Sequence, residues 1–170
     1  MVLLAASAFF SSLEAYALED GQTLRIGRGA FSIMPKNSSL DAGAQAEMWT
    51  DAQTNSQRWV LQSAGTDTYM LSNAYTGKFL ACTSGVTAGA AVSVQDRAAA
   101  ASRGRWQLVP VEGSTNQYYI YASSTRRYAL STQGDTADGN TITLVAVDKA
   151  EPSQYTWTGE ECAPRENALT

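Results

Sequence analysis

Residues 41–49 read DAGAQAEMW, residues 87–95 read TAGAAVSVQ, and residues 137–145 read ADGNTITLV. Each stretch has a glycine in its third position and apolar residues in its sixth and eighth positions. An apolar residue at every second position after a glycine is typical of a turn followed by a β-strand with one buried face. The stretches therefore predict three equivalent strands. Their predicted inward side chains are Ala46 and Met48, Val92 and Val94, and Ile142 and Leu144.

The rest of the chain repeats with the same period. A tryptophan comes after each stretch, at Trp59, Trp106 and Trp157, and two further strand candidates precede each glycine. This gives about four short strands in each of three copies, which must share one core because none can bury a face alone. We expect residues 18–160 to form one all-β domain, a β-trefoil with pseudo-threefold symmetry. The alanine-rich residues 96–106 are interpreted as a loop or a single helical turn.

Several motifs of the repeat resemble one known family. Residues 57–59 read QRW, which matches the Gln-x-Trp signature of ricin-type β-trefoil lectins, and residues 75–80 read YTGKFL, which is similar to the same family. The signature is altered to GRW at residues 104–106 and to QYTW at residues 154–157. The resemblance covers nearly all of residues 18–160. It implies a carbohydrate-binding module, of the kind attached to secreted glycoside hydrolases and toxins.

The composition excludes most catalytic chemistry. The 170 residues include no histidine, which removes Ser-His-Asp and Cys-His mechanisms, histidine bases and the commonest zinc sites. The acidic residues fall mainly in turns, such as Asp135 and Asp138, and no glycine-rich phosphate loop is present. We expect no catalytic residue, no cofactor and no metal. With a net charge of −4 and a pI near 4.8, nucleic acid is not an expected partner.

The two ends of the chain predict export and a larger protein. Residues 1–17 contain an apolar run that ends in Ala-Tyr-Ala, the pattern of a cleaved signal peptide, and the run is too short to span a bilayer. We therefore expect an exported monomer without a membrane anchor. Residues 161–170 read as a linker-like tail, which would lead to a downstream catalytic domain. Cys82 is expected as a buried thiol and Cys162 as a thiol of the tail, with a bridge between them left open.

The family resemblance places the best binding site in the first copy. A ricin-type pocket combines an aspartate, a polar residue with an aromatic residue two positions later, and an Asn-Gln pair before the tryptophan. Glu47 and Trp49 fit the polar and aromatic positions, and Gln57 fits the signature. We expect Trp49 to stack on a sugar ring, with hydrogen bonds from Glu47, Gln57 and either Asp51 or Asn55.

The other copies depart further from the family pattern. Gln95 and Val145 occupy the aromatic position, and the expected aspartate is matched to Ser32, Ala81 and Leu130. Loss of that acceptor predicts weak binding. An equal alternative is that Trp49 only covers the barrel wall. Two other functions stay open: a protein-interaction or protease-inhibitor domain that uses the segment 95–103, or a structural spacer with degenerate sugar sites.

Overall fold

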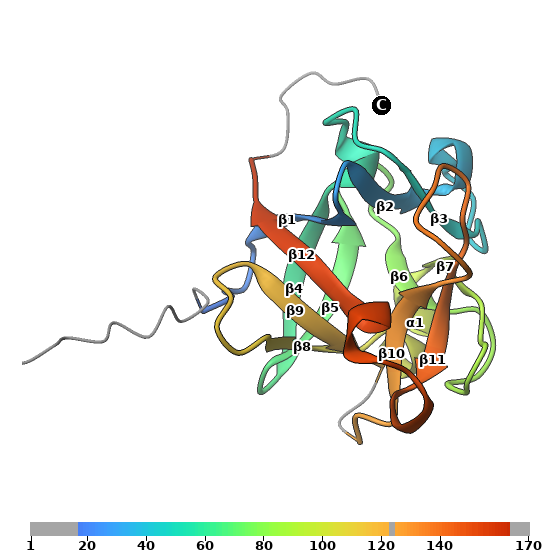
Figure 1. Ribbon diagram of the computed structural model, residues 1–170. Helices are drawn as coiled ribbons and strands as arrows, with labels where there is room; N and C mark the ends of the chain where they lie inside the picture. Colours follow the sequence, from blue (N-terminus) through green and yellow to red (C-terminus); the bar gives the residue numbers. More distant parts are fainter. Residues whose placement is uncertain (1–16, 123–124, 164–170) are drawn as a thin grey trace, which may run out of the picture.

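The computed structural model describes residues 17–122 and 125–163, and most of them form short antiparallel strands (Figure 1). The strands are β1 (Thr23–Arg28), β2 (Phe31–Pro35), β3 (Ala46–Thr50), β4 (Trp59–Gly65), β5 (Thr68–Asn73), β6 (Phe79–Cys82), β7 (Val92–Gln95), β8 (Trp106–Pro110), β9 (Gln117–Tyr121), β10 (Tyr128–Thr132), β11 (Ile142–Ala146) and β12 (Thr156–Glu161). Strands β1–β4 form copy one, β5–β8 copy two and β9–β12 copy three. The expectation of an all-β trefoil with about four strands per copy is confirmed.

The first and the last strand of each copy together close a six-stranded barrel. The pairs run in a ring, from β1 to β4, β5, β8, β9, β12 and back to β1. The middle two strands of each copy form the hairpins β2–β3, β6–β7 and β10–β11, which cap one end of the barrel. In Figure 1 the barrel strands lie on the left and the hairpins on the right.

The glycine turns join the three hairpins into a cycle. The amide of Gly43 donates to the carbonyl oxygen of Val94 at 2.7 Å, that of Gly89 to Leu144 at 2.8 Å, and that of Gly139 to Met48 at 2.8 Å. All three glycines have a positive φ, between 76° and 91°, which residues with a Cβ rarely adopt. The turn of each copy therefore contacts the hairpin of the next copy, and the turn of copy three contacts copy one.

The three tryptophans fill the shared core in the same way. Trp59, Trp106 and Trp157 are 0–1% exposed, and the predicted inward residues of the three stretches are equally buried. Each indole Nε1 donates to a backbone carbonyl oxygen on the hairpin of its own copy. The acceptors are Ile33 at 3.0 Å, Leu80 at 2.8 Å and Leu130 at 2.8 Å. These bonds satisfy the buried indole donors and identify the equivalent residues of the copies.

The alanine-rich segment is more ordered than the sequence predicts. It forms a helix, α1 (Arg97–Arg103), where we expected a loop or a single turn. Its residue Ala100 is fully buried, and burial of that face supplies the stability that a seven-residue helix lacks on its own. Short 3₁₀ turns occur at η1 (Lys36–Ser38), η2 (Asn55–Gln57), η3 (Val147–Lys149) and η4 (Pro152–Tyr155).

Both cysteines are free thiols. Cys82 is fully buried on β6, as expected, and burial raises its pKa to about 11. Cys162 comes directly after the last strand, and its amide donates to the carbonyl oxygen of Thr23 at 3.0 Å, so the sheet continues one residue beyond β12. The predicted signal peptide, apart from Ala17, lies outside the described residues, as do residues 164–170 of the predicted tail. Within the described part of the chain, no helix is long and apolar enough to cross a membrane.

Candidate functional site

Each hairpin has an outer face that is turned away from the barrel core. In copy one this face carries Ser32, Met34, Glu47 and Trp49, because alternate residues of a strand point to opposite sides and Ile33 and Met48 point inward. The equivalent residues are Phe79, Ala81, Ser93 and Gln95 in copy two, and Ala129, Ser131, Thr143 and Val145 in copy three. Trp49, Gln95 and Val145 therefore occupy one equivalent position, as the sequence suggested.

The position expected for an aspartate needs a correction in two copies. The residue after the tryptophan-bound carbonyl is Met34 in copy one, Ala81 in copy two and Ser131 in copy three. Ser32, matched to the aspartate in copy one, lies two residues before this position, and Leu130, matched in copy three, lies one residue before it. Similar apolar neighbours allow the sequences to be aligned with such a shift. Ala81 is the one matched residue that directly follows the tryptophan-bound carbonyl. None of the three equivalent residues is an acid.

The outer face of copy one is polar at its base and aromatic at its edge. Trp49 is 44% exposed, whereas Glu47, two residues earlier on the same side of β3, is only 5% exposed. The segment after β2 contacts both this base and η2, since the backbone amide of Asn37 bonds to Glu47 and the Ser38 hydroxyl donates to the Ser56 hydroxyl at 3.0 Å. Asn55 begins η2 beside Ser56 and is half-buried. The face therefore presents one exposed aromatic ring, with the buried carboxyl of Glu47 two residues away on the same strand.

Burial changes the acidity of Glu47. Loss of solvent raises the pKa of this carboxyl, and the negative charge of Asp138 adds to the effect, although the backbone amide of Asn37 and the charge of Lys36 oppose it. The net pKa is higher than that of an ordinary glutamate. The carboxyl already accepts a hydrogen bond from the backbone amide of Asn37.

Gln57 lies behind this face rather than on it. Its side chain is buried, with the residue 1% exposed, and Oε1 accepts the backbone amide of Ala52 at 2.8 Å. Its Nε2 donates to the carbonyl oxygen of Thr50 at 2.9 Å. The expected contact between Gln57 and a ligand is therefore corrected to a positioning role, because both ends of the amide hold the segment after Trp49.

Asp51 belongs to a separate charged cluster. Its carboxylate pairs with Arg58 at 2.9 Å and accepts the hydroxyl of Ser32 at 3.1 Å, and Arg25 lies 3.6 Å away. Burial alone would raise the pKa of Asp51, but the hydrogen bonds and the positive charges around it lower the pKa below its ordinary value. A cavity of about 280 Å³ beside this cluster is lined by Asp51 but not by Trp49. The Asp51 carboxylate is thus engaged by Arg58 and Ser32, and its contact with a ligand on Trp49 stays a prediction.

The outer face of copy two is filled by the protein itself. Helix α1 packs over it, and Ala100 forms an apolar cluster with Phe79, Ala81 and Met70. Gly104 ends the helix so close to β6 that a Cβ would lie 2.7 Å from the carbonyl oxygen of Leu80. This close contact explains why the glutamine of the signature is a glycine in copy two.

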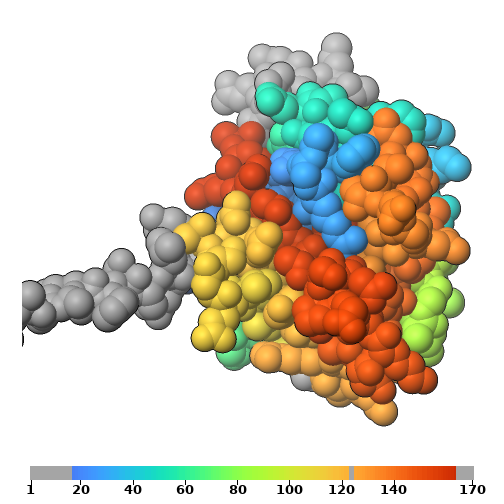
Figure 2. Space-filling model, in the orientation of Figure 1, coloured from blue at the N-terminus to red at the C-terminus, as the bar shows by residue number. Residues whose placement is uncertain are grey.

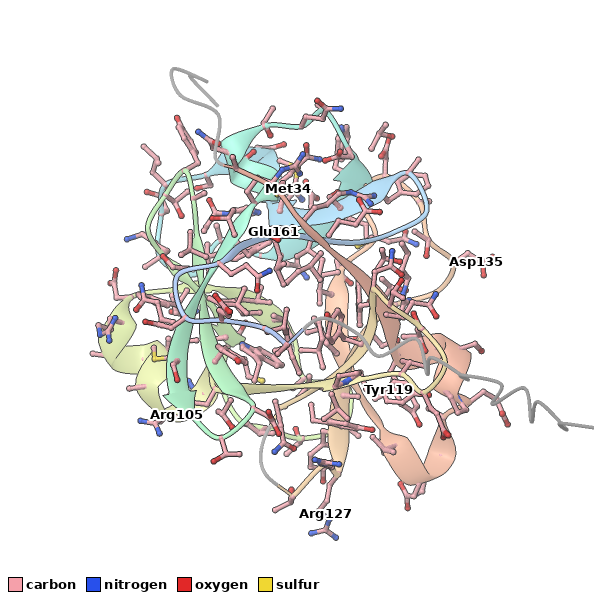
Figure 3. All side chains as sticks on the ribbon, turned by 90° about the vertical axis from the view of Figure 1, so that its left-hand side faces the viewer. Met34, Arg105, Tyr119, Arg127, Asp135 and Glu161 are labelled. Carbon is pink, nitrogen blue, oxygen red and sulfur yellow. The ribbon has the colours of Figure 1, made fainter. Side chains whose placement is uncertain are left out.

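Copy three has a polar cavity on its outer face. The cavity has a volume of about 350 Å³, and Val145 and Ser131 lie in its wall at the positions of Trp49 and Met34. Arg28 also lines it, held by hydrogen bonds to Thr132 Oγ1 at 3.1 Å and to the carbonyl oxygen of Gln154 at 2.6 Å. Asp135 extends outward at its rim (Figure 3). Sequence reasoning missed this cavity because Arg28 comes from copy one, and the only local signal was the polar turn at Asp135.

No group of three or more acidic or cysteine side chains in the described ranges is arranged to hold a metal ion. The outer faces therefore offer hydrogen-bonding groups and one exposed ring.

The comparisons with known proteins agree with this architecture. A family profile described as ricin-type beta-trefoil lectin domain-like matches residues 25–95 and, in a second register, residues 55–145. The chain belongs to this family. Its members share the threefold repeat, which explains why the profile matches in two overlapping registers. Among curated protein sequences, none matches the chain.

Solved ricin-type and designed trefoils have the same fold at low identity. The ricin B-like lectin of Macrolepiota procera, solved with lactose, is 20% identical with a TM-score of 0.70, over 86% of this chain and 99% of that one. The designed threefold protein ThreeFoil is 19% identical with a TM-score of 0.73, over 82% and 99%. The exo-β-1,3-galactanase 1,3Gal43A of Clostridium thermocellum is 18% identical with a TM-score of 0.72, over 86% of this chain and 31% of the enzyme.

Proposed function

We propose that this ricin-type domain binds carbohydrate through the outer face of copy one, with Trp49 as the stacking platform and Glu47 as the hydrogen-bonding group at its base. The observation that carries this proposal is the exposure of Trp49, which is 44% accessible while the other three tryptophans are buried. An indole ring beside a carboxyl is suited to the apolar face and the hydroxyl groups of a sugar. Without an acid at Met34, we expect weak binding.

We further propose that the domain is a non-catalytic accessory module of an exported protein. Family membership supports the non-catalytic role, and the galactanase supports the accessory role, because a similar domain occupies about a third of that enzyme. Export rests on the signal-like residues 1–17 alone. A protease inhibitor would need an exposed loop at the segment 95–103. Most of this segment instead forms α1 and packs on β6, which disfavours that alternative.

Tryptophan fluorescence tests the site directly. The protein is first screened on a glycan array, and the best glycan is then titrated into wild type and the variants Trp49→Ala and Leu40→Ala. We expect the ligand to change the emission of Trp49, and Trp49→Ala to weaken binding about tenfold or more. Leu40 is the matched control, because it is the other large exposed apolar residue in the described chain, at 59%. Equal affinity of wild type and Trp49→Ala, with both proteins folded, would exclude this site.

A further inference from the structure

The turn of copy three makes a contact that the turns of the other copies do not. Asp138 lies in this turn, and its carboxylate accepts hydrogen bonds from the backbone amide of Thr50, at 2.5 Å, and from the Thr50 hydroxyl, at 2.9 Å. Thr50 is the last residue of the β2–β3 hairpin of copy one. Figure 2 shows the orange segment of copy three against the blue segment of copy one. One carboxylate thus occupies the junction between these two copies.

The antiparallel ladder explains why the Thr50 amide is available. In such a ladder the amides of one strand point alternately toward the partner strand and away from it. Trp49 and Asp51 point their amides to β2 and its turn, as the bond from Asp51 to Ala30 at 2.7 Å shows, so the amide of Thr50 points toward the turn of copy three. The same register occurs in copy three, where Ala146 is the equivalent of Thr50. Its amide is therefore directed toward the turn of copy two.

The turn of copy two supplies no carboxylate at this junction. Ala88 stands where copy three has Asp138, and a methyl group accepts no hydrogen bond. In place of a contact there is a cavity of about 490 Å³, lined by Ala88 and by the end of the β10–β11 hairpin, including Ala146. The cavity is thus at the place that the Asp138 carboxylate fills in copy one.

The side chains around this cavity are mainly basic. Arg126, Arg127 and Lys149 line it, with Asp148 as the one acid among its lining residues, although the protein as a whole carries a net charge of −4. None of the three cations forms an ion pair with a carboxylate of residues 17–122 and 125–163. Arg126 is oriented by a hydrogen bond from Nε to Gln107 Oε1 at 2.7 Å, which uses one of its five donors.

The third junction lies between the turn of copy one and the hairpin of copy two. There a carboxylate of the protein itself balances the nearby positive charge. In copy two, Asp96 is the equivalent of Thr50, and it pairs with Lys78 at 2.9 Å. At the copy-three junction the one lining acid, Asp148, stands beside three cations, and none of these cations forms an ion pair with a carboxylate of the described residues. Figure 3 shows Arg127 extending outward at the lower edge of the molecule, and the residue is exposed.

We propose that the cavity lined by Ala88, Ala146, Arg126, Arg127 and Lys149 binds the carboxylate of an acidic saccharide, such as a uronic acid. The carboxylate takes the place that Asp138 occupies in copy one, accepts the Ala146 amide, and pairs with the guanidinium groups, which match it geometrically. The saccharide part of this inference rests on the proposed carbohydrate-binding function. The carboxylate part rests on the cavity alone.

Backbone-amide NMR titrations with glucuronate, and with glucose as the neutral sugar, test the proposal. We expect glucuronate to shift the amide signals of Ala146 to Lys149, and glucose to leave them unchanged. Ala88→Asp should weaken the glucuronate response at least about tenfold, because it places an internal carboxylate in the cavity. Ala42→Asp is the matched control, since it adds the same charge at the equivalent turn of copy one and should change nothing.

A second pair of variants guards against a folding defect of Ala88→Asp. Arg127→Gln should weaken glucuronate binding, and Arg105→Gln, which removes the same charge from an exposed residue beyond α1, should not. Absence of any shift at Ala146, or equal weakening by Ala88→Asp and Ala42→Asp, would overturn the proposal. Trp49→Ala separates the two sites, because it should weaken binding on copy one about tenfold or more and leave the Ala146 shifts intact.

Discussion

The outer faces of copies one and two are built on equivalent hairpins, but the face of copy one is exposed and the face of copy two is covered. On copy one, the segment after β3 turns away and is held by Gln57, so that Trp49 remains 44% exposed. On copy two, the segment after β7 forms α1 and places Ala100 on Phe79. Whether such a face is open to a ligand therefore depends on the path of the segment that leaves the hairpin. The hairpin itself does not decide it.

The inner faces of the same copies differ little. Each tryptophan is buried and donates to a hairpin carbonyl of its own copy at 2.8–3.0 Å. The threefold pattern is thus a property of the core, and the differences between copies are confined to the outside. This contrast can be tested by substitutions that act on one side and leave the other unchanged.

The largest effect is expected from the core tryptophans. Replacing Trp59, Trp106 or Trp157 with alanine, one at a time, should each lower the free energy of unfolding by about 3–5 kcal/mol, because each removes a buried ring and leaves a cavity. Urea denaturation of the three variants measures this. Losses that differ among the copies by more than about 2 kcal/mol would show that the inner faces are not equivalent.

A smaller effect is expected from the charged cluster of copy one. Asp51→Asn should cost about 2–3 kcal/mol at neutral pH, because it leaves Arg58 buried without its carboxylate and leaves Arg25 with Glu160 alone. Since the folded-state pKa of Asp51 is lowered, its stabilisation is present above the ordinary aspartate pKa of about 3.9 and is lost as the pH falls through the folded value. Urea denaturation at pH 7 and pH 3 measures the difference. A gap between wild type and variant that is the same at both pH values would contradict this role.

The smallest of the three effects concerns the contact between α1 and copy two. Gly104→Ala should cost about 1–3 kcal/mol, because its Cβ would meet the Leu80 carbonyl at 2.7 Å and the Cβ of Ala100 at 3.0 Å. Gly85→Ala is the control, since a Cβ there meets nothing within 4 Å and the glycine has no positive φ. Thermal unfolding of both variants provides the comparison. If Gly104→Ala is as stable as Gly85→Ala, the helix is not held tightly on β6.

The fold and part of the site were predictable from local patterns. The repeated glycine, the alternation after it and the tryptophan beyond are each short-range features, and together they require three units around one core. The same register placed Trp49, Gln95 and Val145 at one position. The three residues matched to the aspartate, Ser32, Ala81 and Leu130, are not equivalent in the structure, because apolar neighbours on the first hairpin strands make shifts of one or two residues hard to see in sequence.

The sequence alone determined the trefoil fold and the position of Trp49 on an outer hairpin face, because strand alternation and turn chemistry act between residues close in sequence. Tertiary structure decided the rest: that Gln57 and Asp51 are occupied by neighbouring groups, that α1 fills the face of copy two, and that Ala88 leaves a basic cavity open. Each of these depends on which turn meets which hairpin in the closed cycle of copies, or on how a connecting segment packs over a hairpin. Such contacts join residues that no short-range pattern relates.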